Sequence, residues 1–117
     1  MIAIELPWPE PCLWPNSRSH WTVKSQAAAA QKQEAFVHTR NAGGALFPVP
    51  THLPVRLIFH KPNTRRRDLD NAQAAMKHAL DGIAQAWQVD DSVFVPTSEW
   101  GEVRPPRGSV TVQVGEP

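Results

Sequence analysis

The chain has 117 residues, and its 12 lysines and arginines against 11 aspartates and glutamates give a formal net charge of +1. This length predicts one domain over residues 1–117, because domains typically run to about 100–150 residues. The lone Cys12 excludes an internal disulfide framework and a zinc site built from thiolates. Without a secretory signal or a stretch of about 20 apolar residues, we expect a soluble, cytoplasmic protein with no membrane partner. A charge this close to zero argues against a nucleic-acid partner unless the basic residues are clustered.

The first half of the chain predicts one strand and one helix, separated by proline-rich sequence. Residues 2–6 alternate apolar with small or acidic side chains, which is typical of a strand, and the prolines between residues 7 and 15 predict an extended loop. Residues 25–40 are rich in Ala, Gln, Lys and Glu. They predict a helix that begins at an N-cap on Ser25 and ends at the glycines that follow.

The second half of the chain predicts the remaining strands and one long helix. Residues 55–60 are rich in β-branched and aromatic side chains, and residues 109–114 alternate valine with polar side chains, so both predict strands. We also predict a loop at residues 48–54 and a polar turn at residues 61–67. A long helix follows at residues 69–87, and a short strand that bends or ends early at residues 93–95. The order β, α, β, α, β, β predicts an α+β fold, with a small mixed sheet of about four strands and two main helices packed on it.

The densest charge pattern is RRRDLDN at residues 65–71, where the predicted turn passes into the long helix. One interpretation is an ordinary helix N-terminus, since DNAQ at residues 70–73 fits a capping box with Asp70 as the cap. The other is a metal site, because carboxylates two residues apart on an extended chain point the same way and Mg²⁺ binds carboxylate oxygens. Arginine side chains beside such a site would grip the phosphates on which the metal acts.

The predicted helix over residues 69–87 has an apolar face and a polar face. The apolar face predicts core packing, and its residues are Ala72, Ala75, Met76, Ala79, Leu80, Ile83 and Trp87. On the polar face, Asp70 and Lys77 lie seven residues apart and therefore almost above each other. Lys77 either orients a phosphate there or forms an ordinary surface pair with Asp81, four residues further on.

Two adjacent carboxylates, Asp90 and Asp91, follow this predicted helix. Aspartate is common in turns, so one interpretation is a turn into the next strand. They approach the carboxylates at the start of the helix only if the chain doubles back along it, and the spacing leaves that open.

Two segments together resemble the RusA family of Holliday junction resolvases. They are RRRDLDN, followed by an amphipathic helix ending in ALDGIAQAWQVDDSVF, and the opening ELPWPEP, which is similar to the family's LPWPP-like start. The resemblance runs from residue 4 to the last predicted strand and is strongest at residues 61–95. The family consists mostly of phage- or prophage-borne bacterial endonucleases that cut four-way DNA junctions in recombination and repair. The resemblance implies an α+β homodimer with one active site per subunit and Mg²⁺-dependent hydrolysis of phosphodiesters.

The resemblance also implies roles for individual residues. The family's essential carboxylates match Asp68, Asp70 and Asp91, which become catalytic ligands of Mg²⁺, with Mn²⁺ as a substitute and no organic cofactor. Asp90 matches a neighbouring acid with an accessory role. The expected contacts to DNA phosphates are Arg65, Arg66, Arg67 and Lys77, with Arg18, Lys24 and Lys61 as further candidates.

The sequence departs from the family at one functional position. The family's lysine, six residues after the first aspartate of its motif, is Ala74 here, and we expect Lys77, one turn further along the helix, to take over its catalytic role. His78 stands where many members carry an acid. Two alternatives therefore remain: a non-catalytic protein that binds DNA junctions, and a small interaction module whose acidic residues only cap a helix.

Three tryptophans, Trp8, Trp14 and Trp21, surround the proline-rich loop. Aromatic side chains can stack on unpaired bases at the centre of a junction. The interpretation that we favour is packing beneath the loop or at a dimer interface.

Overall fold

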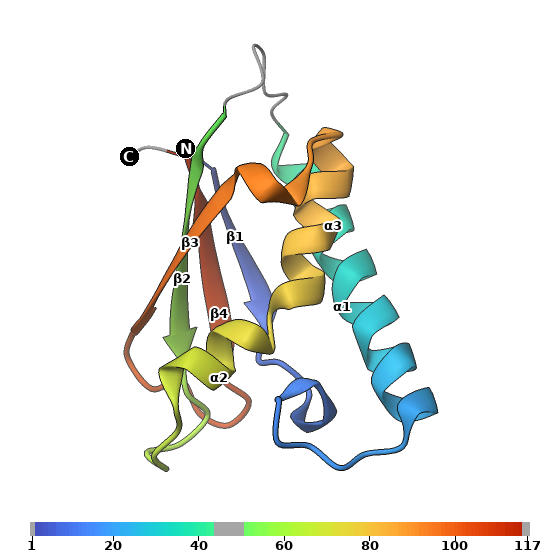
Figure 1. The fold of residues 1–117 in the computed structure, drawn as a ribbon. Coiled ribbons are helices and arrows are strands. Elements are labelled where there is room, and N and C mark those ends of the chain that lie inside the picture. Colours follow the sequence, from blue (N-terminus) through green and yellow to red (C-terminus); the bar gives the residue numbers. More distant parts are fainter. Residues whose placement is uncertain (1, 44–50, 116–117) are drawn as a thin grey trace.

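Four strands form one mixed sheet in the order β1-β4-β2-β3 (Figure 1). The computed structural model describes residues 2–43 and 51–115. The strands are β1 Ile2–Pro7, β2 Leu53–His60, β3 Phe94–Trp100 and β4 Ser109–Val114. Strand β4 pairs antiparallel with both β1 and β2, whereas β2 and β3 are parallel. A parallel pair needs a crossover connection, and here the crossover carries the segment with the densest charge pattern.

The helices lie on one side of this sheet (Figure 1). They are α1 Trp21–Ala42, α2 Leu69–Ala74 and α3 Lys77–Trp87, with short 3-10 turns η1 Pro11–Leu13 and η2 Asp91–Val93. Helices α1 and α3 pack against each other, and they cross closely at Gly82. A Cβ atom on Gly82 would lie 2.2 Å from the carbonyl oxygen of Lys32, so only glycine allows this approach.

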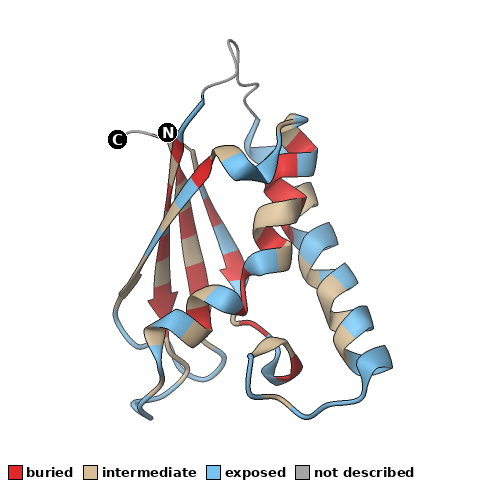
Figure 2. Ribbon diagram, viewed as in Figure 1, coloured by how far each residue is buried: buried red, intermediate tan, exposed pale blue. Residues whose placement is uncertain are grey.

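The core lies between the sheet and α3 (Figure 2). It follows from the alternation of side chains along the strands, because every second residue of β2 and β4 faces the helices. The fully buried side chains include Val55, Leu57, Phe59, Met76, Ile83, Val110 and Val112. The apolar face predicted for the long helix is therefore largely correct, although Leu80 and Trp87 are only partly buried.

The expected α+β class and the four-stranded mixed sheet are confirmed. Strand β4 has the predicted bounds, β2 begins two residues earlier than predicted, and the loop predicted at 48–54 lies partly outside the described residues. Strand β3 is longer than the predicted 93–95 and continues past Pro96. Proline is tolerated there because β3 is an edge strand, whose outer side has no neighbouring strand that needs the missing backbone N–H.

The predicted start of the first helix is wrong. Helix α1 begins at Trp21 and not after Ser25, because the Nδ1 atom of His20 caps it and accepts the backbone N–H of Thr22 at 3.2 Å. Histidine is not among the usual N-cap residues, so the pattern of Ser, Thr, Asp and Asn favoured the wrong position. The predicted end is close, since Gly43 follows the helix with φ of +79°.

The long second helix is also wrong, because the chain breaks it into α2 and α3. The element order is therefore β, α, β, α, α, β, β, with the break at Ala75 and Met76. At the break, the Gln31 side chain of α1 donates to the carbonyl oxygen of Ala75 at 2.9 Å and accepts the N–H of Ala79 at 3.0 Å. A side chain inserted into the helical hydrogen bonds is a known cause of such a break.

Within the described residues, no helix is long and apolar enough to cross a membrane.

Candidate functional site

The first part of the site is the pair Asp68 and Asp70 at the start of α2. Asp68 is the N-cap, with extended backbone, and its Oδ1 atom accepts the backbone N–H groups of Asp70 at 2.8 Å and Asn71 at 3.3 Å. The predicted capping box with Asp70 as the cap is thus wrong: Asp70 lies in the first helical turn. Both side chains are exposed, and within residues 2–43 and 51–115 neither the second Asp68 oxygen nor the Asp70 carboxylate has a hydrogen bond to protein.

This pair suits a hard divalent cation for a different reason than alternation along an extended chain. Asp70 is helical, so the two carboxylates share one helix N-terminus and not one face of a strand. The oxygens that remain free, open to solvent, match the usual Mg²⁺ set of one or two carboxylates completed by water and phosphate oxygens.

Asp91 does not join this pair within one chain. It begins η2, beyond the C-terminal end of α3, whereas Asp68 and Asp70 lie at the start of α2 (Figure 1). The 11 residues of α3 alone span about 16 Å. Among the described residues, no three His, Cys, Asp or Glu side chains are grouped so that they could hold a metal ion.

Asp91 instead lies beside Asp81 of α3. The pKa of Asp91 is raised, first by its hydrogen bond to Asp81, and further by burial and by the charges of Asp81 and Asp90. The pKa of Asp90 is lowered, because its side chain accepts the backbone N–H of Ser92 at 2.9 Å. Finding Asp81 from the sequence requires knowing that the chain after α3 folds back against that helix.

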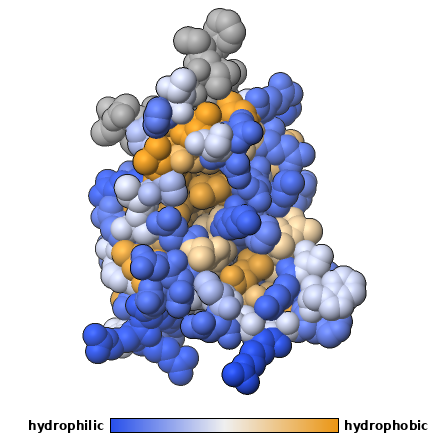
Figure 3. Space-filling model, in the orientation of Figure 1, coloured by the Kyte–Doolittle hydropathy of each residue, from blue (hydrophilic) through white to orange (hydrophobic). Residues whose placement is uncertain are grey.

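The second part of the site is the loop between β2 and α2, which carries Arg65, Arg66 and Arg67. The Asn63 side chain orders it, since its Oδ1 atom accepts the Arg65 N–H at 3.0 Å and the Arg67 guanidinium at 3.1 Å. None of the three arginines forms an ion pair within the part of the chain that the structure describes. Figure 3 shows strongly hydrophilic side chains at this end of the molecule.

Aromatic side chains contact this loop at both of its ends. The Arg67 guanidinium lies over the Trp8 ring, 5.4 Å from its centroid, and the Lys61 ammonium lies 5.1 Å from the centroid of Trp100. The Phe59 ring makes edge-to-face contacts with both tryptophans, and its centroid lies 6.1 Å from that of Trp8 and 6.0 Å from that of Trp100. Burial and the neighbouring Arg65 charge lower the pKa of the Arg67 guanidinium. The loop is therefore fixed at both ends by cation–π contacts.

The tryptophans of the proline-rich segment differ in their surroundings. The ring centroids of Trp8 and Trp14 lie 5.8 Å apart, and both side chains pack against the core. Packing beneath the loop is therefore confirmed for these two tryptophans. Trp21, in contrast, is 70% exposed on the first turn of α1, beside the His20 ring.

Lys77 is the first residue of α3 and is exposed. The break at residues 75–76 removes the reason for placing it directly above Asp70, because that relation assumes one continuous helix. The alternative ion pair with Asp81 is also absent from the described residues, where Asp81 lies 3.9 Å from His78. Ala74, at the position of the family's lysine, is the exposed last residue of α2.

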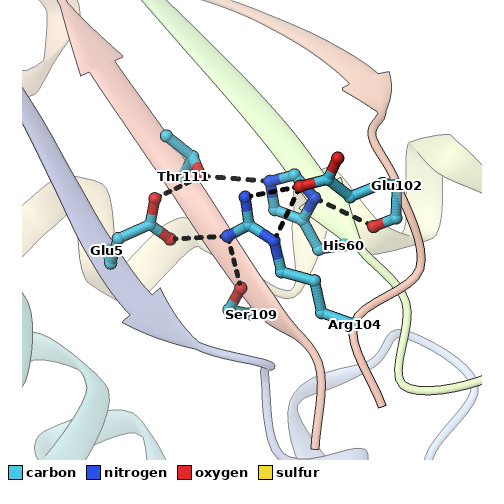
Figure 4. Close-up of polar contacts among 6 residues, drawn as sticks. All are labelled: Glu5, His60, Glu102, Arg104, Ser109 and Thr111. Atoms are coloured by element: carbon cyan, nitrogen blue, oxygen red, sulfur yellow. Dashed lines mark hydrogen bonds and ion pairs between the residues drawn. The ribbon is translucent and has the colours of Figure 1, made fainter.

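A polar network on the opposite face of the sheet was not predicted (Figure 4). Buried His60 contacts the Glu102 carbonyl oxygen at 2.9 Å and the Thr111 hydroxyl at 3.1 Å, and Thr111 donates to Glu5 at 2.6 Å. Arg104 donates to Glu102 at 2.9 Å and lies 3.6 Å from Glu5. This network ties the β3–β4 loop to three strands.

No family model matches the chain. Over 97 residues, which are 81% of the chain, it is 40% identical to an uncharacterized protein of Xylella fastidiosa (strain Temecula1). The matched part is 63% of that protein, so the chain spans less than two thirds of its relative's length. Fold and site together define an α+β protein with an exposed carboxylate pair beside a loop of three arginines, none of which forms an ion pair with the described residues.

Proposed function

We propose that the protein is a Mg²⁺-dependent endodeoxyribonuclease that resolves four-way DNA junctions as a homodimer. The observation that carries this proposal is that the exposed guanidinium groups of Arg65 and Arg66 are followed directly by the exposed carboxylates of Asp68 and Asp70, of which Asp68 uses only one oxygen for its cap. Guanidinium groups bind phosphate oxygens in pairs, and the carboxylates bind the cation that acts on the same phosphate.

Asp68 and Asp70 would hold the metal ion. When bound, Mg²⁺ supplies an activated water and neutralises charge on the scissile phosphate, and Mn²⁺ would substitute for it. The role of Asp68 depends on its cap, because the bonds to two backbone N–H groups fix one oxygen and leave the other for the ion. Arg65 and Arg66, which are exposed, would orient the phosphate before cleavage.

Asp91 can complete this site only if a second copy supplies it. A two-fold dimer interface is formed by the same surface patch of both subunits. The end of α3 in one subunit can therefore meet the start of α2 in the other. We therefore place Asp68 and Asp70 of one subunit with the partner subunit's Asp91. A cation held there would offset the repulsion between Asp91 and its neighbours Asp81 and Asp90, which contributes to the raised pKa of Asp91.

Cleavage of a synthetic four-way junction tests the function. The purified chain should cut it with Mg²⁺ and not with EDTA. Asp70→Asn should keep junction binding and lose cleavage, while Glu99→Gln, a control on the far face of the sheet, should keep both. Full cleavage by Asp70→Asn would show that the assignment of the site is wrong.

A non-catalytic junction-binding protein is the second candidate. It is favoured by Ala74 at the position of the family's lysine and by the helix break that separates Lys77 from Asp70. Tight junction binding without cleavage in Mg²⁺ or Mn²⁺ would select this function.

A further inference from the structure

The loop between β3 and β4, residues 101–108, lies directly against the basic loop between β2 and α2. The backbone N–H of Arg104 donates to the carbonyl oxygen of Lys61 at 2.8 Å, and the N–H of Gly108 closes the turn on the Arg104 carbonyl oxygen, also at 2.8 Å. Gly108 has φ of +72°, and a Cβ there would lie 2.7 Å from the His60 carbonyl oxygen and 2.9 Å from Pro62. The two loops are therefore in contact and form one continuous surface.

The two arginines of this turn differ in their surroundings. Arg104 is bound to Glu102 and lies close to Glu5, so its charge is compensated and holds the loop to the sheet (Figure 4). Arg107 is exposed, and among the described residues it has neither a hydrogen bond nor an ion pair. Arg107 thus shares the free state of Arg65 and Arg66 on the neighbouring loop.

We propose that Arg107 binds the same DNA backbone as Arg65 and Arg66, which makes the β3–β4 turn a second phosphate-binding element. This inference rests on the proposed function. Successive phosphates of one strand are spaced by about 3.4 Å along the helix axis, so a backbone that crosses one loop presents charges to the loop beside it. DNA is favoured over a membrane surface because the turn offers charge and two prolines, and Val103 is its one exposed apolar side chain, without an aromatic residue or leucine to insert.

Binding of the full chain to a labelled four-way junction, measured in EDTA over a series of salt concentrations, tests the proposal. A phosphate contact contributes about 0.9 to the slope of log K against log salt. Arg107→Gln should lower the slope by about that amount and weaken binding to junction and duplex by the same factor. Arg107→Lys keeps the charge and should restore the slope. Arg40→Gln, on α1 over the Phe36 ring, is the matched control and should change nothing.

The outcomes separate this inference from the proposed function. If Arg65→Gln lowers the slope and Arg107→Gln does not, only the role of Arg107 is overturned. If the unaltered chain binds neither junction nor duplex, the proposed function and this inference both fail. Binding to anionic vesicles that depends on Arg107, without binding to DNA, would overturn the choice of ligand.

Discussion

The side-chain amide of Gln31 on α1 donates a hydrogen bond to the backbone carbonyl of Ala75, where α2 ends. Its oxygen accepts the N–H of Ala79 in the first turn of α3. The Ala75 carbonyl loses its helical partner at the break, because the Ala79 N–H bonds to the Met76 carbonyl oxygen at 3.1 Å, and the Gln31 side chain contacts both groups. The contact sets the direction of α2, and with it the position of Asp68 and Asp70 at the far end of that short helix.

Gln31→Ala should therefore lower both stability and cleavage. Removing the amide leaves the Ala75 carbonyl without its partner, which costs about 1–3 kcal/mol for a buried group that water cannot reach, whereas the Ala79 N–H keeps its bond to the Met76 carbonyl oxygen. Thermal unfolding followed by circular dichroism measures the loss. Gln33→Ala, an exposed position on the same helix, is the control and should stay within about 0.5 kcal/mol of the unaltered protein. Equal effects of the two substitutions would contradict the role of Gln31.

The sequence predicts the strands well and the helices less well, for a physical reason. Alternation of side chains over residues 109–114 reports directly on a strand with one buried face, so β4 has the predicted bounds. The break at Ala75 depends on Gln31, which lies 44 residues away along the chain. A local pattern contains no such contact, and the alanine-rich stretch predicts one continuous helix.

The candidate site shows the same division. The charged segment at residues 65–71 is visible in the sequence, and the structure shows Arg65, Arg66 and Asp70 exposed there; their phosphate-binding role stays a prediction. The neighbours of Asp91 and the position of Arg107 depend on how distant segments fold back, so the sequence predicted neither of them.

Asp90 and Asp91 should respond to pH in opposite ways when no metal is present. The pKa of Asp91 is raised, so ionised Asp91 disfavours the fold, and its cost appears as pH rises through that pKa. Asp91→Asn should then raise the free energy of unfolding at neutral pH, and the gain should vanish well below the ordinary aspartate pKa of 3.8. The measurement is urea unfolding in EDTA across acid and neutral pH.

Asp90→Ala provides the contrast. The hydrogen bond to Ser92 lowers the pKa of Asp90, so its stabilisation is present above the ordinary pKa and disappears as pH falls. This variant should be less stable than the unaltered protein at neutral pH and equal to it in acid. Two variants that change stability in the same direction would contradict the geometry of this turn.

Lys77→Ala should abolish junction cleavage if this lysine replaces the one that is missing at Ala74. Lys77 is exposed at the start of α3 and has no ion pair in the described part of the chain, so its removal should leave thermal stability nearly unchanged. Lys32→Ala, an exposed lysine on α1, is the control. Cleavage by Lys77→Ala at a near-normal rate would remove Lys77 from the site, and Ala74→Lys would then test whether the family's position can raise the activity.

Mixing two inactive variants should restore activity if each site is shared between subunits. Asp70→Asn and Asp91→Asn each disable both sites of their own homodimer. In a mixed dimer, the subunit with intact Asp68 and Asp70 meets an intact Asp91 from its partner, which leaves one complete site. Co-refolded variants should nick one strand of the junction, whereas separately folded variants mixed without exchange should not. If all three carboxylates came from one chain, both chains of the mixed dimer would stay defective, and no nicking would appear.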